Sequence, residues 1–555
     1  MSEHEDRSTA TREPRTHEER LAYPQLSPEV LAALEGRGVW RVFEGGDVVF
    51  DVGQPGYDFV YFRTGSIDIV DRDGDRKVIT ANSPGFLGEL GLLMGQSTFL
   101  AAVAAERCEA LVVPHEALRE LVAAVPELAD AVVTAFAMRR RNLIEWGAGG
   151  LTILGPEGDP AVTRLLSYAS RNRLPHRFVD RADAAAVAEL AETCALPAAG
   201  VVAITGRSVV LEDPTPAGVA TALGLDLGLS CGDRFDLVVV GAGPAGLAAA
   251  VYGASEGLRT LVVDDTAIGG QAGTSSRIEN YLGFSTGVSG GELAYQGEIQ
   301  AVKFGARFAV PRRVTRLRRV GDGGELEVKL DDGVCVAAGA VVLANGVQYR
   351  RLPLENLEAY EGAGVYYAAT ELEARFCRGT DVVIVGGGNS AGQAAMFLSR
   401  HARCTHVVVR GEGLAATMSS YLSGRIEKDE RIRLRTHTEV CALHGADGHL
   451  EAVEFCNSET GERERLETKA LFIMVGAAPN TDWLEGVVDV DAKGFVVTGA
   501  GAGDDPFATS CPGVWAVGDI RSGSVKRVAS SVGEGSVVVS SVHRHLSRAE
   551  PVTAA

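Results

Sequence analysis

The chain has 555 residues, 46% of them apolar and 23% charged, which is the balance of an ordinary globular protein of about three to five domains. Its net charge of −20 excludes binding to nucleic acid or anionic membranes through overall charge, and no apolar run approaches a membrane span. The nine cysteines are scattered without any CxxC, which predicts a reducing, cytoplasmic setting and argues against a disulfide framework or a zinc site.

The N-terminal part is predicted to be a disordered leader followed by a β-roll. Residues 1–20 are charged throughout, without the apolar core of a secretory signal. Residues 21–146 contain the short strand-like runs VVFDV, DFVYFR, SIDIVDR and KVIT between Gly and Asp turns. A helix is expected over 126–146, ending in three arginines. Its apolar stripe consists of Leu128, Val132, Ala135 and Phe136.

The segment GFLGELGLLMGQSTFLAAV resembles the phosphate-binding cassette of cyclic-nucleotide-binding domains. The resemblance implies a nucleotide pocket in which Gly88, Glu89 and Leu90 take the ribose hydroxyl. Where that family has an arginine for the cyclic phosphate, this chain has Thr98 and Phe99, so a strong charge-assisted pair is lost. Two alternatives stay open: a weakened nucleotide pocket, or a β-roll kept for dimerisation or domain contact through the 126–146 helix.

Residues 150–228 are predicted to form an α/β domain with the element order β-α-β-α-β-β-α. This order is that of the thioredoxin and glutaredoxin fold, which the segment resembles in topology. Redox cysteines in that fold lie at the start of the first helix, where this chain reads GPEGDP. Cys194 lies at the end of the second helix, and Gly200 replaces the proline that precedes the third strand. The domain is therefore predicted to be redox-silent.

The run DLVVVGAGPAGLAAAVYGASEGLRTLVVDD is the strongest motif in the chain. A buried strand leads into Gly241, Gly243 and Gly246, a helix follows, and Asp264 ends the next strand. The glycines allow a tight turn and close approach to a pyrophosphate, the helix N-terminus attracts phosphate, and the carboxylate takes ribose hydroxyls. This pattern predicts a dinucleotide-binding domain of the Rossmann type.

A second such unit follows in DVVIVGGGNSAG, where Gly386, Gly388 and Ala391 occupy the three small positions. Its second strand ends in Arg410 rather than an acidic residue. A cation at this point suits a 2′-phosphate, so NADPH is favoured over NADH, although a solvated surface charge would look the same.

With GGQAGTSSRIENYLGF, VVLANGVQYRRL, LFIMVGAAPNTDWL and GVWAVGDIRSGSVKRVASSVGEGS in this order, the chain from Asp236 to Leu546 resembles the low-molecular-weight thioredoxin reductase family. The resemblance implies an FAD-binding domain (233–355 and 484–548) with an inserted NAD(P)H-binding domain (356–483). It places FAD along Gly241, Gly243, Pro244, Ala245, Gly246, Asp264, Gly269, Gly270, Gln271, Asn280, Ala344, Gly346, Gly518, Asp519, Arg527, Val528 and Ala529. It places NADPH along Gly386, Gly388, Asn389, Ser390, Ala391 and Arg410. The predicted fold class is thus multidomain: a β-roll, a thioredoxin-like α/β domain and two Rossmann-like three-layer α/β domains.

One stretch departs from that family, which carries Cys-Ala-Thr-Cys where this chain reads Ala368-Ala369-Thr370-Glu371. A disulfide accepts electrons because one sulfur leaves as thiolate, which alanine and glutamate cannot do. Glu371 is interpreted as a proton donor or substrate anchor, as a residue that orients the nicotinamide, or as a surface residue. Cys377 is considered as a lone redox thiol or as a small core residue.

The sequence therefore predicts an NADPH-oxidising flavoenzyme that passes electrons from FAD to a non-disulfide acceptor, such as a quinone, an electron-carrier protein or oxygen. A redox or nucleotide sensor with little turnover, and a thioredoxin-disulfide reductase that uses a thiol outside a CxxC, are the alternatives. The resemblance and the apolar stripe of the 126–146 helix lead us to expect a homodimer. No metal-binding motif is found, and the eleven histidines are interpreted as isolated.

Overall fold

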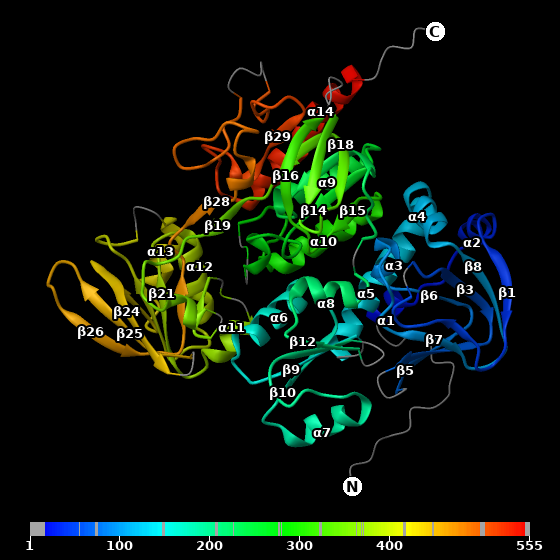
Figure 1. Ribbon diagram of the computed structural model, residues 1–555, viewed down its shortest axis with the longest axis horizontal. Helices are drawn as coiled ribbons and strands as arrows, with labels where there is room; N and C mark the ends of the chain where they lie inside the picture. Colours follow the sequence, from blue (N-terminus) through cyan, green and yellow to red (C-terminus); the bar gives the residue numbers. More distant parts are fainter. Residues whose placement is uncertain are drawn as a thin grey trace.

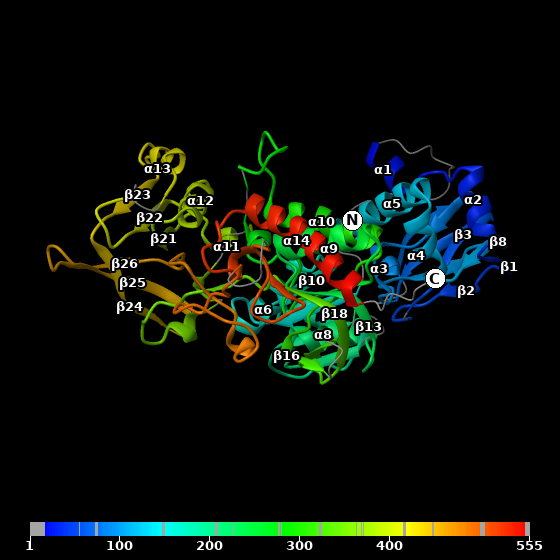
Figure 2. The same cartoon turned by 90° about the horizontal axis from the view of Figure 1, so that it is seen from above.

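The molecule consists of four units (Figure 1). In both views the β-roll and the second dinucleotide domain lie at opposite ends, with the first dinucleotide domain and the thioredoxin-like domain between them (Figures 1 and 2). In the part of the chain described by the computed structural model, no helix is long and apolar enough to cross a membrane. The described residues are 17–54, 56–72, 76–146, 150–205, 209–225, 227–275, 278, 280–320, 325–361, 363–367, 369, 371–414, 418–446, 449–499 and 505–549.

The β-roll is built from two antiparallel four-stranded sheets, in the orders β1-β8-β3-β6 and β2-β7-β4-β5. The long helix α5 covers one end, and its stripe of Leu128, Val132 and Phe136 is fully buried. Its elements are α1 (His17–Ala22), α2 (Pro28–Glu35), β1 (Val39–Phe43), β2 (Val48–Phe50), β3 (Phe59–Thr64), β4 (Ser66–Asp71), β5 (Arg76–Asn82), β6 (Gly85–Leu87), α3 (Leu90–Met94), β7 (Ala101–Ala104), β8 (Cys108–Val113), α4 (His115–Ala124) and α5 (Pro126–Trp146).

The apolar stripe of α5 is covered within the chain itself. It belongs to one continuous hydrophobic core that extends from the β-roll to helix α10 of the first dinucleotide domain. The Tyr295 hydroxyl on α10 donates a hydrogen bond to the Ala137 carbonyl (3.2 Å), and Lys303 pairs with Asp130 (2.6 Å). The expectation that this stripe is a dimer interface is therefore wrong, because its side chains are already fully buried within the chain, with Phe136 packed against Phe59 and Phe86 of the β-roll.

The domain predicted to be thioredoxin-like, called the thioredoxin-like domain below, has the element order that the sequence indicates, with one four-stranded sheet in the order β10-β9-β11-β12. Strands β9 and β10 are parallel, and β11 runs antiparallel to β9. Its elements are β9 (Leu151–Gly155), α6 (Pro160–Arg171), β10 (His176–Asp180), α7 (Ala184–Thr193), β11 (Val202–Thr205), β12 (Val209–Glu212) and α8 (Pro216–Ala222).

The first dinucleotide domain has a central sheet in the order β15-β14-β13-β18-β17-β16, to which β29 adds beside β18. Helix α9 packs against β13 and against the C-terminal helix α14, so the two ends of the domain meet across an inserted domain. Its elements are β13 (Arg234–Val240), α9 (Pro244–Ser255), β14 (Thr260–Val263), η1 (Ala272–Thr274), α10 (Gly290–Lys303), β15 (Arg307–Ala309), β16 (Val314–Val320), β17 (Glu325–Leu330), β18 (Cys335–Leu343), η3 (Asp482–Leu484), β29 (Val514–Ala516), η4 (Gly518–Ile520) and α14 (Val528–Ala549).

The second dinucleotide domain contains a parallel sheet, β20-β27-β21-β22-β23, and an antiparallel sheet, β24-β25-β26. The antiparallel pair β19–β28 connects it to the first domain. Its elements are η2 (Leu357–Tyr360), β20 (Val365–Tyr366), α11 (Glu371–Phe376), β21 (Asp381–Val385), α12 (Asn389–Leu398), β22 (Cys404–Val408), α13 (Ser420–Ile426), β23 (Ile432–Arg435), β24 (Thr438–Ala446), β25 (His449–Asn457), β26 (Arg463–Glu467) and β27 (Leu471–Ile473), with β19 (Val347–Tyr349) and β28 (Ala477–Pro479) as connectors.

Candidate active site

The first glycine-rich turn lies between β13 and α9, and each of its glycines has a different steric reason. Gly241 has φ +104°, and a Cβ there would lie 2.5 Å from the Ala344 carbonyl oxygen. A Cβ on Gly246 would lie 1.8 Å from the Gly241 oxygen. Gly243 differs, because the nearest atom to its Cβ position is the Gly270 Cα at 3.9 Å, so the backbone there borders open space.

Helix α9 therefore begins at an open cradle. Its N-cap is Gly243, which provides no side-chain hydrogen bond to the first N–H groups, and Pro244 and Ala245 form the first turn. Uncapped N–H groups at a helix N-terminus are donors for a phosphate, and the helix dipole favours negative charge there. The cradle has the shape and the donors that a dinucleotide pyrophosphate requires.

Asp264 follows β14 and holds the turn in place. Its carboxylate accepts hydrogen bonds from the backbone N–H of Ala242 (2.8 Å), Thr266 (3.0 Å) and Ala267 (3.0 Å). Burial raises the pKa of this carboxyl, although the three donors act in the opposite direction. A carboxylate has about four acceptor positions, so one stays available for a ribose hydroxyl.

A second wall is formed by residues 269–271. Gly270 has φ +54°, and a Cβ there would lie 2.9 Å from the Gly243 Cα. The Gly269 N–H donates to the Ala242 carbonyl (2.8 Å), and the Gln271 amide donates to the Val347 carbonyl (3.3 Å). These contacts bring the first residues of the predicted segment GGQAGTSSRIENYLGF against the first glycine turn. Asn280 is exposed on the loop that follows.

The C-terminal segment closes the site from the other side. Gly518 and Asp519 form η4, and a Cβ on Gly518 would lie 2.9 Å from the Ala245 Cβ. Burial raises the pKa of the Asp519 carboxyl, and nearby Lys526 lowers it. Arg527 directly precedes α14, and Val528 and Ala529 begin it.

Two residues that the sequence analysis missed hold this turn. Glu534 on α14 accepts from the Gly518 N–H (2.6 Å) and forms a two-point ion pair with Arg521, at 2.7 and 3.1 Å. Both side chains of the pair are less than one-fifth exposed, at 14% and 16%. No local spacing indicates this pair, because its partners lie on a turn and on a helix whose approach only the fold determines.

The strand end after β18 also faces this region. The Ala344 N–H pairs with the Val240 carbonyl (2.7 Å), and Gly346 has φ +57° with open space around it. Asn345 donates from Nδ2 to the Asn480 carbonyl (2.6 Å), while its buried Oδ1 has no partner among the described residues. An orphaned acceptor next to the cradle, together with the open Gly243 and Gly346, fits a bound dinucleotide.

The second glycine turn repeats the first. Gly386 has φ +145°, and a Cβ there would lie 2.3 Å from the Met474 carbonyl oxygen. A Cβ on Gly388 would have no atom of the described residues within 4 Å. Gly388 is the N-cap of α12 and gives no side-chain hydrogen bond. Ala391 is fully buried against the domain core, as a small third position requires.

The remaining predicted contacts of this turn lie at its rim. Asn389 and Ser390 are exposed in the first turn of α12, and Asn389 accepts a hydrogen bond from the Ser419 N–H (2.8 Å). Arg410 is exposed just beyond the end of β22, at the same edge of the sheet. These residues fit a second dinucleotide whose phosphates lie at the α12 N-terminus.

The substituted dithiol stretch leads into helix α11, which begins at Glu371. Ala369 is buried in the core of the second dinucleotide domain. Ala368, Thr370 and the side chain of Glu371 lie outside the described residues, so the three interpretations of Glu371 stay predictions.

Cys377 does not have the surroundings of a redox thiol. It is fully buried in the same core and its Sγ–H donates to the Glu373 carbonyl (3.2 Å). Burial, with Glu373 nearby, raises the pKa of this thiol to about 12. A thiol that stays protonated at neutral pH is a poor nucleophile, so the redox role considered for Cys377 is contradicted and the core interpretation holds.

The described residues contain a disulfide, although the sequence analysis argued against a disulfide framework. Cys441 on β24 and Cys456 on β25 are bonded, with their Cα atoms 6.0 Å apart. The strand register is shifted between Val440 and Ala442, so Cys441 has no direct partner on β25 and Cys456 lies opposite Glu439. A cross-strand pair of this kind depends on register and leaves no CxxC signal.

The histidines are not all isolated either. His406 lies between Asp381 (3.4 Å) and Arg435, which donates to its Nδ1 (3.0 Å), and Cys404 completes a cluster with potential metal-ligand atoms within 4.8 Å. Burial, with Arg435 nearby, lowers the pKa of His406. Because Arg435 and Arg403 already bind the histidine and the aspartate, we assign no metal to this cluster.

In the cassette of the β-roll, the expected ribose ligand is already occupied. Glu89 accepts from the Gly91 N–H (2.9 Å) and from Arg140 Nε on α5 (2.5 Å), and both side chains of this ion pair are at most 10% exposed. The Gly88 carbonyl accepts from Arg139 (3.0 Å), and Leu90 is buried at the start of α3. Thr98 and Phe99 stand where the related family has the arginine that binds the cyclic phosphate. Phe99 is buried in the core of the thioredoxin-like domain.

Two glycine turns, each with an open helix N-terminus and its own strand edge, define a two-dinucleotide oxidoreductase. Comparison with known proteins agrees: residues 235–535 match the pyridine nucleotide-disulphide oxidoreductase family, and residues 40–124 match the cyclic nucleotide-binding domain family. The chain therefore belongs to the pyridine nucleotide-disulphide oxidoreductases, in the thioredoxin reductase-like branch, which are enzymes that use FAD and NADPH.

The relatives and solved structures that follow each match somewhat more than half of this chain. The thioredoxin reductase of Bacillus subtilis is 31% identical over 312 residues, which cover 56% of this chain and 95% of the relative. Among solved structures, thioredoxin reductase from Lactococcus lactis has a TM-score of 0.53 at 27% identity, covering 57% of this chain and 99% of that one. The enzyme from T. acidophilum has a TM-score of 0.52 at 29% identity, covering 56% and 98%.

Proposed function

We propose that this protein oxidises NADPH at FAD and transfers the electrons directly from the flavin to an acceptor that is not a disulfide. The observation that carries the proposal is the replacement of both dithiol cysteines, by Ala368 and Glu371, together with the buried, high-pKa thiol of Cys377. FAD supplies hydride acceptance and can return electrons singly or in pairs. A quinone, an electron-carrier protein or oxygen fits as acceptor.

The chain's own residues bind and orient the two dinucleotides. The α9 N-terminus and Asp264 would hold the flavin nucleotide's phosphates and ribose, and the Glu534–Arg521 pair fixes the Gly518 turn. Arg410 supports selection of the 2′-phosphate of NADPH, because a guanidinium makes strong charge-assisted hydrogen bonds to a phosphate.

The first test is an anaerobic titration of the FAD-loaded protein with NADPH, followed by the flavin absorbance. One equivalent per FAD is expected, because Ala368 and Glu371 at the family's dithiol positions cannot take up a second pair of electrons. Two equivalents would contradict the proposal and favour a disulfide reductase that uses other thiols. Repeating the titration with Cys441→Ser would then show whether the second pair of electrons enters the Cys441–Cys456 disulfide.

A gain-of-dithiol variant sharpens the test. Ala368→Cys combined with Glu371→Cys is expected to consume two equivalents, because it restores the spacing of the family's Cys-Ala-Thr-Cys. Glu371→Cys alone is the matched control and is expected to consume one. If the single variant also consumed two, an additional thiol would have to be present, and the absence of a dithiol would no longer explain the behaviour.

A redox sensor with little turnover is the second candidate, and one group of contacts favours it. The end of α6 in the thioredoxin-like domain contacts the flavin-binding loops, where Arg171, Asn172 and Arg173 donate to the carbonyls of Gly270 (3.4 Å), Thr266 (3.1 Å) and Gly291 (2.6 Å). A change in these loops would reach the front domains directly. Stoichiometric bleaching by NADPH followed by slow reoxidation with quinone, ferricyanide and oxygen alike would support the sensor over the enzyme.

A further inference from the structure

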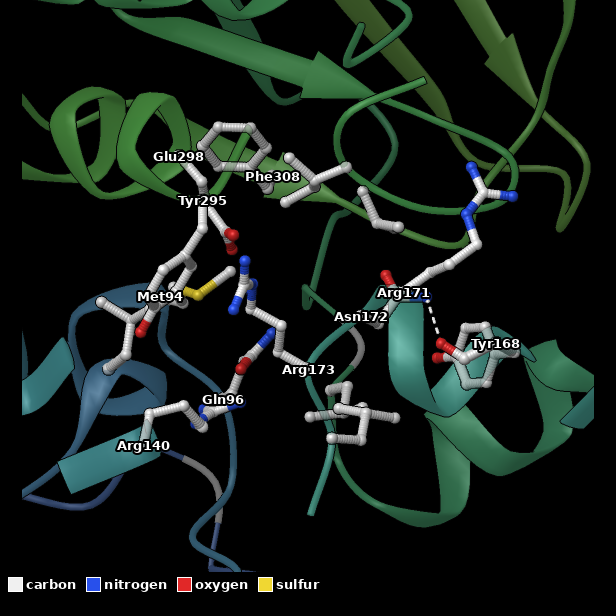
Figure 3. Close-up of a pocket in the computed structure, with 15 residues that line it drawn as sticks. Met94, Gln96, Arg140, Tyr168, Arg171, Asn172, Arg173, Tyr295, Glu298 and Phe308 are labelled. Atoms are coloured by element: carbon white, nitrogen blue, oxygen red, sulfur yellow. Dashed lines mark hydrogen bonds between the residues drawn. The ribbon is translucent and has the colours of Figure 1, made fainter. Parts of the chain in front are cut away.

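A cavity lies where the β-roll, the thioredoxin-like domain and the FAD-binding domain meet (Figure 3). Its volume is about 40 Å³, and it is partly enclosed. One water requires roughly 10–15 Å³ of cavity volume, so the cavity has room for a few waters or for one tetrahedral oxyanion. None of the residues that line it is among those predicted to bind FAD or NADPH.

The polar part of the cavity is rich in hydrogen-bond donors. Arg140 comes from α5 of the β-roll, Gln96 from the cassette, and Arg173 from the end of α6. Guanidinium groups carry only donors, so each needs acceptors. Arg140 is 4% exposed, and within the part of the chain that the structure describes its Nη2 has no hydrogen-bond partner, although its Nε binds Glu89. An unmet donor on a buried cation is costly, and an oxyanion supplies several acceptors at once.

Arg173 is held in position but keeps donors free for a ligand. Its guanidinium stacks over the Tyr295 ring at 4.1 Å and donates one hydrogen bond to the Gly291 carbonyl at 2.6 Å. Figure 3 shows it extending from the thioredoxin-like side towards Tyr295 and Glu298 of α10. Glu292 forms an ion pair with it at 3.7 Å, which is too long for a hydrogen bond.

Glu298 is the carboxyl that lines the same cavity, and burial raises its pKa to about 7. When protonated it is a hydrogen-bond donor, so it adds to the donor set instead of repelling an anion. The other walls are apolar, formed by Met94, Leu174, Leu225, Ile268, Phe308 and Val310. Apolar walls weaken the dielectric screening of charge, which strengthens pairing between an arginine and a small anion.

We propose that this cavity binds a small oxyanion, either inorganic phosphate or the phosphoryl group of a larger molecule, and that the ligand acts as an effector. Its ligands would come from three domains: Arg140 and Gln96 from the β-roll, Arg173 from the thioredoxin-like domain, and Glu298 from the FAD-binding domain. Because Arg171 and Asn172, next to Arg173, contact the flavin-binding loops, occupancy of the cavity is transmitted to the flavin site. The inference does not depend on the electron acceptor.

The test is isothermal titration calorimetry of the FAD-loaded full chain with inorganic phosphate and, separately, with glycerol 3-phosphate, at pH 6.5 and constant ionic strength. Binding of phosphate alone supports a free anion as ligand, and binding of both supports a phosphoryl group. Arg173→Gln is expected to weaken binding roughly 10- to 100-fold, the value of a lost charge-assisted hydrogen bond. Arg164→Gln, an exposed arginine on α6 outside the cavity, is the control and leaves the affinity unchanged.

Gln96→Ala provides a second variant at the β-roll side of the cavity, in case Arg173→Gln does not fold. It should weaken phosphate binding severalfold without changing flavin content. Absence of binding by the unmodified protein, with water alone filling the cavity, would overturn the proposal. Equal phosphate affinity in the unmodified protein, Arg173→Gln and Gln96→Ala would overturn it as well, since binding would then occur elsewhere.

Discussion

Two glycines on one helix allow a controlled test of how the C-terminal helix completes the flavin site. Gly535 on α14 is buried against α9, and a Cβ there would lie 2.1 Å from the Ala245 carbonyl oxygen and 3.0 Å from the Ala248 Cβ. Gly533, two residues earlier, has nothing within 4 Å of its Cβ position. The substitutions Gly535→Ala and Gly533→Ala therefore add the same methyl group in two different surroundings.

The expected magnitudes follow from these distances. Alanine is favoured over glycine in a helix by about 1 kcal/mol, which both variants gain. In Gly535→Ala the contact is too short by about 1 Å, and α14 must move away from the first turn of α9 at a cost of about 1–3 kcal/mol or more. The movement carries Glu534 away from the Gly518 turn, so FAD affinity should fall roughly 5- to 150-fold.

The assay is a fluorescence titration of the flavin-free protein with FAD, supported by thermal unfolding. Gly533→Ala is expected to bind FAD as the unmodified protein does and to unfold at an equal or slightly higher temperature. If Gly535→Ala bound FAD within twofold of Gly533→Ala, the close packing of α14 on α9 would not determine flavin binding, and the reasoning would be refuted.

Three further measurements test other parts of the structure. Glu89→Gln leaves the charge of Arg140 buried without its counter-ion, so urea unfolding of the β-roll should show a loss of about 3–5 kcal/mol, and a loss below about 1 would contradict a buried pair. Glu298 has a raised pKa, so its contribution is complete below the ordinary carboxyl pKa and is lost as pH rises through about 7. Glu298→Gln should therefore remove up to about 3 kcal/mol of the stability difference between pH 5 and pH 8. Cys441→Ser should destabilise its domain by about 3 kcal/mol, since a 15-residue separation is no longer cross-linked, and alkylation of the unmodified protein without reductant should leave Cys441 and Cys456 unlabelled.

The nucleotide turns could be predicted because every residue they require is local. The glycines of each turn, the helix that follows and Asp264 lie within one stretch of sequence, and the structure places them around one cradle. The helix at 126–146 was likewise predicted at its observed bounds, because its apolar spacing and its Pro126 start are local signals.

What the sequence could not indicate depends on elements that meet only in the fold. Arg140 was recognised as part of a basic helix end, but its partner Glu89 lies on another element of the β-roll. The same holds for Glu534 with Gly518. The Cys441–Cys456 bond depends on a register shift between two strands, which residue spacing does not reveal. The surface that buries the α5 stripe could not be inferred from one helix, because an apolar stripe does not identify what covers it.

The pairing of β29 with β18 has a consequence for the order of events during synthesis. Val341 pairs with Val514, and the whole second dinucleotide domain is made between them. At translation rates of about 5–20 residues per second, roughly ten to thirty seconds separate the two strands. During that interval the NADPH-binding domain has its complete sequence and can fold, whereas the flavin cradle still lacks β29, the Gly518 turn and α14. The NADPH-binding domain can therefore form before the FAD-binding domain is complete. Stable flavin binding requires that α14 has been made.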